Sequence, residues 1–503
     1  MAFVSAWPKP TLTRPGHGNV NPEALAATNG LTGPATSDRL GRPTERRSVP
    51  VIESTVDRDR LRRLMKREER RFVDEHPRSG DLFERGARSL LAGVPMPWMT
   101  EWAGSHPVFV AEARGARFTD VDGHSYVDFC LGDTGAMTGH SPGVTVQAIA
   151  QQAARGITLM LPTEDSIWVG EEMARRFGLP YWQFCLTATD ANRFVLRLAR
   201  AITARPKILV YSWCYHGSVD ETIITLESGE PGPRPGNVGP AVDPAVTTRV
   251  VEWNDVEALQ EALARGDVAC VLAEPALTNI GIVLPDPGYH EKLRELTRRY
   301  GTYLVIDETH CICAGPGGAT KAWGLEPDFL TVGKPLASGV PAACYGITAE
   351  VADRVQAHMA DLPATDVGGI GGTLSGNALS LAAMRATLEN VLTDKAFERM
   401  IPLAERWTDG VKSTIEKFGI PWEVQRLGCR AEYWFCPAPP RTGGQAAAAE
   451  DHELAKFAHL YALNRGILLT PFHNMALMSP ATTEADVDLH TEVFAEMAGE
   501  LFA

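Results

Sequence analysis

The stretches that decide the fold are YLVIDETH at residues 303–310 and FLTVGKP at residues 329–335. Each begins with a short apolar run and ends abruptly in a charged residue, Asp307 in the first and Lys334 in the second. Such runs between polar segments are typical of strands buried on both faces of a parallel sheet. In open α/β sheets, ligands bind at the carboxyl ends of the strands. We therefore expect Asp307 and Lys334 to face a ligand-binding site.

The pairing of Asp307 with Lys334 indicates a particular kind of cofactor. A lysine amine forms a Schiff base with an aldehyde, and a carboxylate keeps a basic ring nitrogen protonated, so the pair suits pyridoxal 5′-phosphate (PLP). Taken alone, an ordinary loop aspartate and a surface lysine are the commoner interpretation. The choice between the two depends on the surrounding sequence.

Strand and helix patterns alternate around these two stretches. Residues 208–211 and 268–273 are strand candidates, and residues 256–264 and 289–300 read as helices between them. This alternation predicts a doubly wound α/β sheet. We predict four regions in chain order: a loose arm at 1–55, an N-terminal helix with part of a small domain at 56–130, a large PLP-binding domain at 131–390, and a C-terminal small domain at 391–503.

Composition excludes several classes of protein. The chain has 503 residues and a formal net charge of -14, which argues against a nucleic-acid partner. Its apolar runs are too short for a membrane span, and its first residues lack a secretory signal. The nine cysteines form no C-x-x-C pair, and Cys311 and Cys313 beside His310 have no second ligand cluster, so we expect free thiols and no metal. These features predict a cytoplasmic protein.

Four further motifs occur in order around the two stretches: FCLTATDAN at 184–192, WCYHG at 213–217, EPALTN at 274–279 and GGTLSGN at 371–377. The first places small and hydroxyl-bearing residues at the start of a helix, where free backbone N–H groups bind anions such as phosphate. Plain helix capping by Thr187 or Thr189 is the alternative. An aromatic ring such as Tyr215 stacks on an electron-poor ring, although ordinary core packing needs no such partner.

From about Arg88 to the C-terminus, this series resembles the class III (fold-type I) PLP-dependent aminotransferases. The branch it resembles is the glutamate-1-semialdehyde aminomutase-like group, which includes β-amino acid and ω-amine transaminases. The resemblance implies an α/β fold with a mostly parallel, doubly wound large domain and a smaller α+β domain built from both chain ends. It also implies PLP as cofactor and a homodimer with shared active sites, because the family threonine at the position of Thr373 reaches the other subunit's cofactor phosphate.

The resemblance also assigns roles to single residues. Lys334 forms the Schiff base and moves the proton, Asp307 keeps the ring nitrogen protonated, and Tyr215 stacks on the ring; these are the implied catalytic residues. For Glu274 a structural role, and for His310 a satisfied structural histidine, are equal alternatives. The implied cofactor-binding residues are Thr187, Ala188, Thr189, Tyr215, His216, Glu274, Asn279, Asp307, Thr309, His310, Lys334 and Thr373.

The candidate substrate-binding residues are Trp98, Trp213 and Arg430. The loop near Gly93 lacks the arginine with which many relatives bind a carboxylate, so Arg430 is the remaining candidate, although a surface ion pair is the commoner role of an arginine. Trp98 and Trp213 suit an aromatic pocket, with core or lid packing as the alternative.

We therefore predict an aminotransferase. It moves an amino group from a hydrophobic or aromatic amine or amino acid, β-amino acids included, to a keto acid by ping-pong chemistry. An aminomutase or racemase on the same scaffold is one alternative, and it needs no second substrate. A non-catalytic PLP-fold binding or regulatory protein is another, against which the intact set of Asp307, Lys334 and Thr373 argues. No G-x-G-x-x-G motif follows a strand, which disfavours a nicotinamide dehydrogenase.

Overall fold

The computed structural model describes residues 56–360, 368–471 and 473–502, and the predicted N-terminal arm at 1–55 lies outside them. The chain separates into two units at residues 49 and 50, and the structure below is that of the second unit. Among the described residues, no helix combines the length and apolar character that a membrane span requires.

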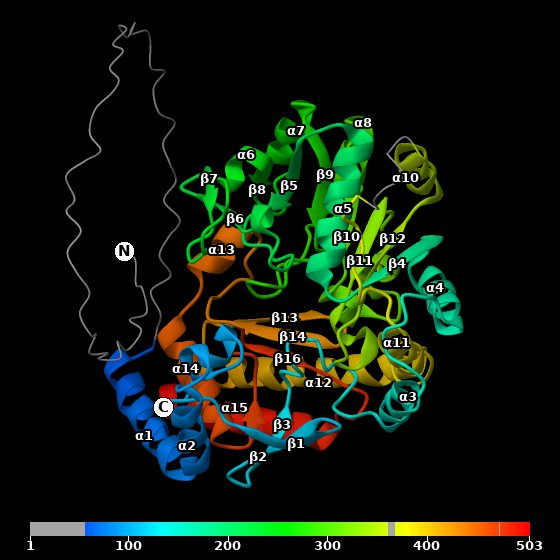
Figure 1. The fold of residues 1–503 in the computed structure, drawn as a ribbon. Coiled ribbons are helices and arrows are strands. Elements are labelled where there is room, and N and C mark those ends of the chain that lie inside the picture. The colour runs from blue at the N-terminus through cyan, green and yellow to red at the C-terminus, as the bar shows by residue number, and fades with distance from the viewer. Residues whose placement is uncertain (1–55, 361–367, 472, 503) are drawn as a thin grey trace, which may run out of the picture. The chain divides into compact units, whose positions relative to one another are not determined.

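A seven-stranded sheet contains both of the stretches that were quoted first (Figure 1). Its order is β4 (Tyr181–Cys185), β12 (Ala343–Ile347), β11 (Phe329–Val332), β10 (Tyr303–Asp307), β9 (Val268–Ala273), β5 (Lys207–Tyr211) and β8 (Thr248–Val251). β12 runs antiparallel to both of its neighbours, β4 and β11, and all the other neighbouring pairs are parallel. Every residue of β9, β10 and β11 is buried, as the continuous apolar runs predicted.

Helix α5 (Ala188–Thr203) packs across β4, β12, β11, β10 and β9. Its inner face consists of apolar residues such as Phe194, Val195 and Leu198, which are buried in the core around the sheet. A capping box starts the helix, because the side chain of Thr187 accepts from Asp190 N–H while the Asp190 carboxylate accepts from Thr187 N–H. The helix start is therefore fixed beside the carboxyl ends of the strands.

Two smaller sheets lie outside the seven-stranded sheet, and the first of them contains strands from both ends of the chain. One has the order β1 (Val110–Arg114), β2 (Arg117–Asp120), β3 (Ser125–Asp128) and β15 (Ile467–Leu468), so that a C-terminal strand completes an N-terminal sheet. The other consists of β13 (Glu423–Leu427), β14 (Arg430–Trp434) and β16 (Met475–Leu477). The long helices α12 (Asp394–Phe418) and α15 (Glu484–Phe502) pack against each other, as Figure 1 shows.

The remaining elements connect these layers. The short hairpin has the strands β6 (Ile224–Glu227) and β7 (Glu230–Pro233). The remaining helices are α1 (Arg58–Glu75), α2 (Pro77–Gly86), α3 (Gly143–Ala153), α4 (Glu164–Phe177), α6 (Pro244–Thr247), α7 (Val256–Ala264), α8 (Tyr289–Arg299), α9 (Gly318–Ala322), α10 (Ala349–Ala360), α11 (Ala378–Asn390), α13 (Gly443–Ala448) and α14 (His452–Leu463).

A buried hydrogen-bonded group joins α1 and α2 to the β2–β3 hairpin. One ring nitrogen of His76 lies 2.7 Å from Phe72 O and the other lies 2.7 Å from the Tyr126 hydroxyl, which donates to Asp120 at 2.8 Å. His76, Asp120 and His124 have their potential ligand atoms within 4.8 Å of one another, the kind of group that holds metal ions. Because the Tyr126 hydroxyl already links His76 to Asp120, we interpret the group as a structural tie.

Candidate active site

Segments that end or begin strands of the large sheet meet at one edge of it. Residues 186–189 follow β4, residues 215–217 follow β5, Asp307 ends β10, and Lys334 follows β11. Residues 339–342 precede β12, whose start lies at the same edge because this strand is antiparallel. Together they enclose a cavity of about 390 Å³. The lining comprises Trp98, Gly135, Leu186, Thr187, Ala188, Thr189, Tyr215, His216, Gly217, Asp307, Thr309, His310, Lys334, Gly339, Val340, Pro341 and Ala342.

Asp307 is buried and held by three donors. Its Oδ2 accepts from Asn192 Nδ2 at 2.8 Å and lies 2.9 Å from His216 Nδ1, and its Oδ1 accepts from Thr309 N at 3.0 Å. Burial opposes the charge of this carboxylate, but the hydrogen bond and positive charge of His216 outweigh it and lower the pKa of Asp307 to about 2. Asp307 is therefore an ionised, oriented acceptor at neutral pH.

His216 carries the matching charge. Burial disfavours the charged ring, yet Cys214 and Asp307 together raise the pKa of His216 to about 10. Asn192 in turn is fixed by Thr331, whose hydroxyl donates to the amide oxygen at 2.6 Å. The sequence motif contained Asn192, but nothing in its pattern pointed to a contact with Asp307.

Lys334 lies between a carboxylate and an imidazole. Its Nζ is 2.8 Å from Asp133 Oδ2 and 2.6 Å from His310 Nε2. Burial, and then the charge of Lys334, hold the pKa of His310 well below its ordinary value, so the ring is neutral. The neutral ring accepts an N–H of Lys334 at Nε2, and its Nδ1 lies 3.0 Å from the Thr134 hydroxyl. Sequence reasoning found Lys334 and His310 and missed Asp133 and Thr134.

The start of α5 provides an anion site at another part of the cavity. The first N–H groups of a helix have no partner within the helix, and Ala188 and Thr189 occupy this position. Gly217 packs against this turn with φ +80°, and a Cβ there would lie 2.1 Å from Thr189 Oγ1. Only a glycine allows this close approach of the loop after β5 to the start of α5.

The residues present fit PLP. Thr309 and His216 line the cavity, and within the described residues Thr309 Oγ1 and His216 Nε2 are buried polar atoms without a partner. Asp307 would hold the ring nitrogen, residues 187–189 the phosphate and Lys334 the aldehyde. Bound there, PLP supplies an electron sink for carbanion chemistry.

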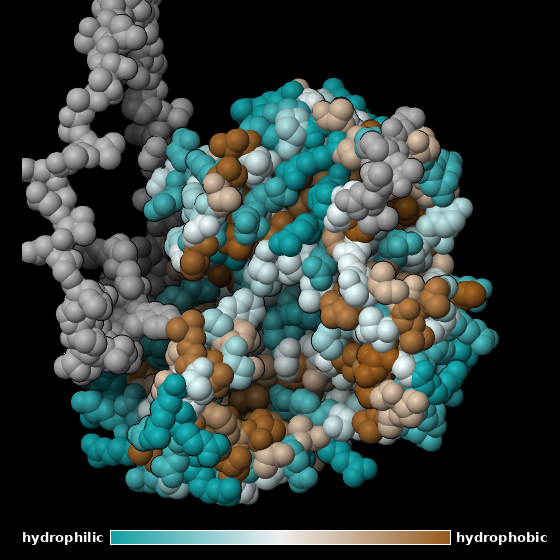
Figure 2. Space-filling view, viewed as in Figure 1, coloured by the Kyte–Doolittle hydropathy of each residue, from teal (hydrophilic) through white to brown (hydrophobic). Residues whose placement is uncertain are grey.

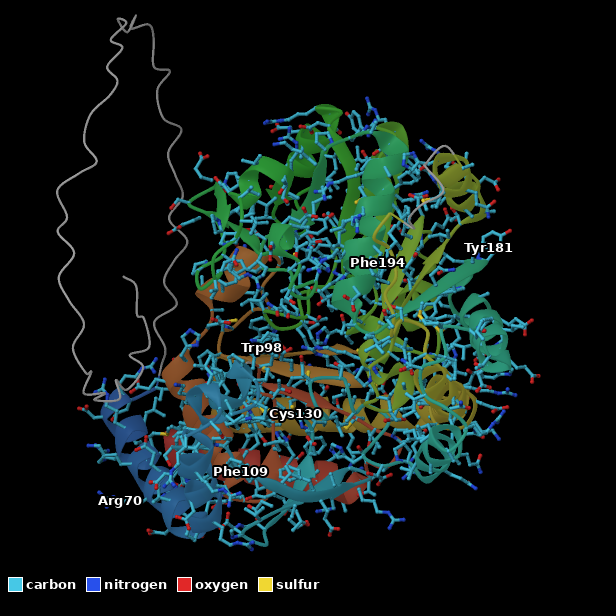
Figure 3. The ribbon with its side chains drawn as sticks, viewed as in Figure 1. Arg70, Trp98, Phe109, Cys130, Tyr181 and Phe194 are labelled. Atoms are coloured by element: carbon cyan, nitrogen blue, oxygen red, sulfur yellow. The ribbon has the colours of Figure 1, made fainter. Side chains whose placement is uncertain are left out.

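Trp98 and Tyr215 form an aromatic wall of the cavity. Their ring centroids are 5.6 Å apart with an interplanar angle of 57°. Trp98, labelled in Figure 3, is 43 % exposed. Trp213 does not line the cavity; the guanidinium of Arg234 lies 5.4 Å from its ring centroid. Of the two predicted tryptophans, the structure therefore brings only Trp98 to the site.

Arg430 lies behind the cavity wall. It is fully buried, donates to Thr278 O at 2.8 Å, and pairs with Glu432 at 3.4 Å. Its Nη1 is 3.4 Å from His310 Nδ1, so its contact with the lined space is indirect. Binding of a substrate carboxylate by Arg430 stays a prediction.

Three more predicted residues lie away from the cavity lining. Glu274 is buried, and its carboxylate accepts from the Thr278 hydroxyl; burial raises its pKa. Asn279 is half-buried, and Thr373 is exposed on this single chain. The exposed position of Thr373 is compatible with a contact to a second subunit, and that role also stays a prediction.

The sheet order, the cavity at the strand ends and the Asp–Lys pair define a PLP-dependent enzyme of fold type I. A sequence profile described as Aminotransferase class-III matches residues 99–496. The chain belongs to this family, and its cofactor is PLP, which confirms the predicted family, fold class, enzyme class and cofactor.

The proteins similar to this chain include aminomutases and an aminotransferase. A curated glutamate-1-semialdehyde 2,1-aminomutase of Persephonella marina is 32% identical over 420 residues, which are 82% of this chain and 96% of the relative. A crystal structure described as a glutamate-1-semialdehyde-aminomutase from Pseudomonas aeruginosa PAO1 is 52% identical, with a TM-score of 0.87, and the match covers 89% of this chain and 99% of that one. A β-phenylalanine aminotransferase structure from Variovorax paradoxus is 25% identical, with a TM-score of 0.78 and coverage of 87% and 97%.

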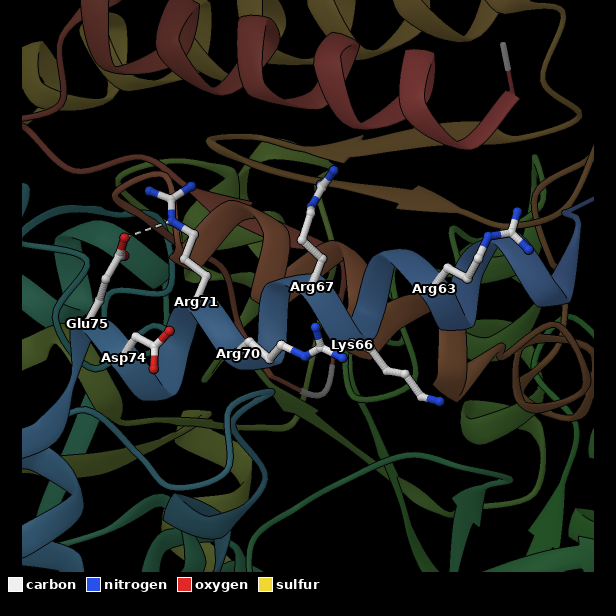
Figure 4. Close-up of a pocket in the computed structure, with 7 residues that line it drawn as sticks. All are labelled: Arg63, Lys66, Arg67, Arg70, Arg71, Asp74 and Glu75. Carbon is white, nitrogen blue, oxygen red and sulfur yellow. Dashed lines mark hydrogen bonds and ion pairs between the residues drawn. The ribbon is translucent and has the colours of Figure 1, made fainter.

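A second hollow lies along α1 and is strongly basic (Figure 4). Some of its charges are paired within the chain: Arg71 with Glu75 at 3.0 Å, and Arg67 with Glu500 at 2.6 Å. Its lining is Arg63, Lys66, Arg67, Arg70, Arg71, Asp74 and Glu75. With acids interleaved among the bases, we interpret it as a solvated helix face.

Proposed function

We propose that the protein is a PLP-dependent aminomutase that acts on a small amino aldehyde bearing a carboxylate, of the glutamate-1-semialdehyde class. The observation that carries the proposal is the 52% identity, over 89% of the chain, to a structure described as such an aminomutase. Curated relatives of the same name, 31–33% identical, match over 82–84% of the chain. This supports the aminomutase alternative better than the predicted transfer from a hydrophobic donor.

The residues around the cavity suit proton movement next to a bound amine. Lys334 Nζ is the only lysine nitrogen among the described residues that line the cavity, and it donates a hydrogen bond to a neutral imidazole. Asp133 balances the positive charge of Lys334 at 2.8 Å. We therefore assign to Lys334 the transfer of the proton and to His310 the hydrogen bond that orients the Lys334 amine.

An aminotransferase needs a second substrate, whereas an aminomutase does not. Moving the amino group of glutamate-1-semialdehyde to the neighbouring carbon gives 5-aminolevulinate, an isomer, so no other reactant is consumed. An aminotransferase transfers the amino group of its donor to a keto acid. Without the keto acid it stops after the first half-reaction.

The test supplies glutamate-1-semialdehyde to enzyme loaded with pyridoxamine 5′-phosphate, without any keto acid. We expect many equivalents of 5-aminolevulinate per active site, measured by NMR. Absence of 5-aminolevulinate, with glutamate-1-semialdehyde consumed continuously only when pyruvate or 2-oxoglutarate is added and aminated, would contradict the proposal and favour the aminotransferase. The Lys334→Ala variant controls for reaction that does not involve the site.

We also propose a homodimer located in the cytoplasm. Exposed apolar residues gather beside the G-T-L-S-G-N segment, where Ala378 N donates to Ile157 O at 3.0 Å. They are Ile157, Leu159, Met160, Leu161 and Leu374. Apolar residues also gather over α3, α4 and α11 in Figure 2, and a patch of this kind favours burial against a partner. All nine cysteines are buried and unpaired, which suits a reducing compartment.

A further inference from the structure

The loop after β3 holds an acid at the reactive lysine by means of an uncommon backbone. Leu131, Gly132, Asp133 and Thr134 have φ values of +46°, +59°, +50° and +80°. Three of them are not glycine, and side-chain-bearing residues in this region are strained and persist only where their surroundings fix them. The clustering of such residues beside Lys334 indicates that the position of Asp133 serves the site.

Specific contacts fix the loop. Asp128 accepts from Leu131 N at 2.7 Å and lies 2.7 Å from His140 Nε2. Asp133 N donates to Cys130 O at 2.9 Å. The Thr134 hydroxyl lies 3.0 Å from His310 Nδ1. The Asp133 carboxylate is therefore directed at Lys334 by a rigid frame.

The carboxylate of Asp133 is ionised, and only one of its two oxygens has a hydrogen-bond partner among the described residues. Burial opposes its charge, but chiefly the positive charge of Lys334 keeps its pKa well below the ordinary value. Oδ2 contacts Lys334, whereas Oδ1 is buried and has no partner in the part of the chain that the structure describes. A partly buried anion of this kind is stabilised by a nearby cation.

The cation in this structure is the free Lys334 ammonium. When the lysine is covalently engaged, its nitrogen keeps at most one N–H, and Asp133 loses its counter-charge whenever that nitrogen is deprotonated. The neighbouring groups do not replace it: His310 is neutral, Arg430 is committed to Thr278 O and Glu432, and His473 lies 3.2 Å from Glu432. The remaining source of a cation is a ligand that enters the cavity.

We propose that Asp133 is a substrate-recognition residue that binds the ammonium group of the incoming amine. The ligand class is a primary alkylammonium, and the inference rests on the proposed function for the identity of that amine. A carboxylate near Asp133 is repelled, so the substrate lies with its amino end at residues 131–134 and its acid end away from them.

The test compares Asp133→Asn with Asp122→Asn. Each removes one negative charge without a change in size, but Asp122 accepts from Arg78 N and Ser79 N and contacts neither Lys334 nor the loop at residues 131–134. The first readout is the pH at which the visible absorbance of the bound cofactor changes. Because an adjacent carboxylate stabilises the protonated form of the nitrogen, we expect Asp133→Asn to lower this pH by about one to three units. Asp122→Asn leaves it in place.

The second readout is selectivity for an amino group. We measure the inhibition constants of 5-aminolevulinate and of levulinate, the same acid without its amine. The native protein prefers 5-aminolevulinate, and Asp133→Asn reduces that preference about tenfold, or ~1.4 kcal/mol. Asp122→Asn lowers thermal stability, because its carboxylate holds the start of α2, and keeps the preference. An unchanged preference in folded, cofactor-loaded Asp133→Asn overturns the inference, whatever the spectrum shows.

Failure of the proposed function has a different signature. If neither acid binds to the native protein, the substrate class is wrong, and propylamine then replaces 5-aminolevulinate in a spectral titration of the bound cofactor. Weaker binding of propylamine to Asp133→Asn, with Asp122→Asn unaffected, supports ammonium recognition by Asp133 without the aminomutase. Equal binding to all three proteins overturns it.

Discussion

Gly217 shows what a single residue contributes to the anion site. Its φ of +80° disfavours a side chain, and an added Cβ would approach Thr189 Oγ1 to 2.1 Å. We expect Gly217→Ala to destabilise the fold by about 1–3 kcal/mol and to weaken binding of PLP, because the start of α5 must shift. Thermal unfolding and a PLP titration measure the two effects.

A matched control is Gly178→Ala. Gly178 has the same φ of +80° at the end of α4, with nothing within 4 Å of an added Cβ. It therefore carries the backbone penalty alone. Equal PLP affinity in the two variants would show that the contact with Thr189 does not position the anion site.

The sequence allowed some site residues to be predicted and not others. Asp307 and Lys334 were found because each ends an apolar strand, a local pattern whose consequence follows from sheet geometry. Asp133 was missed because its role depends on a strained loop and on a lysine 201 positions away, neither of which has a local signature. Arg430 was predicted at the site only because a guanidinium binds carboxylates. In the structure it is fully buried behind His310, which separates it from the cavity.

At the scale of elements, the capping box of α5 links helix stability to the cofactor site. Thr187→Val removes the side-chain bond to Asp190 N, which costs about 1 kcal/mol, and leaves the first turn less fixed. We expect lower stability together with weaker PLP binding, measured by urea unfolding and cofactor titration.

Thr393→Val serves for comparison. Thr393 caps α12 through Ala396 N, at a helix whose start contributes no residue to the cavity lining. We expect a similar loss of stability and an unchanged affinity for PLP. If both variants lose PLP equally, general destabilisation explains the loss.

The strands that were predicted and those that were missed differ in their environment. Buried β9, β10 and β11 have continuous apolar runs, whereas β4 at the sheet edge alternates exposed and partly buried residues and begins with exposed Tyr181. In β12, Gly346 interrupts the pattern because a Cβ there would lie 2.6 Å from the Trp182 ring of β4. The neighbouring strand β4 thus requires the glycine that weakens the strand pattern of β12, so the sequence of β12 alone does not reveal the strand.

At the scale of the whole molecule, buried neutral histidines make the fold sensitive to acid. Burial lowers the pKa of His459 to about 4 and of His490 to about 3. Below about pH 6.5 the unfolded chain binds protons that the folded chain refuses, so the free energy of unfolding falls as pH falls, by about 1.4 kcal/mol per pH unit for each such histidine. Glu308, with a pKa raised to about 7 by burial, acts in the opposite direction.

His490→Phe isolates one of these contributions. His490 packs among Trp407, Phe494 and Phe129, and its Nδ1 has no partner among the described residues. Urea unfolding at pH 7.5, 6 and 5 should show a shallower decline for the variant than for the native chain. Parallel declines would mean that His490 titrates normally in the folded state.

The proposed dimer is also tested on the whole molecule. Leu161 is 73 % exposed within the apolar patch, and Val238 is 93 % exposed in another loop. We expect Leu161→Asp to give monomers by sedimentation and to lose PLP, because the predicted role of Thr373 is to contact the cofactor of the other subunit, and Val238→Asp to do neither. A Leu161→Asp protein that sediments with the native protein would place the interface elsewhere.

Strand β15 pairs with β3, from which the loop of Asp133 leads. Ile467 and Leu468 emerge from the ribosome long after β3, so the sheet behind this loop remains incomplete until they do. We therefore expect the nascent chain to have no finished vitamin-binding pocket before β15 is made. We expect coenzyme capture to follow that step, and a polypeptide cut short before residue 467 to lack the coenzyme.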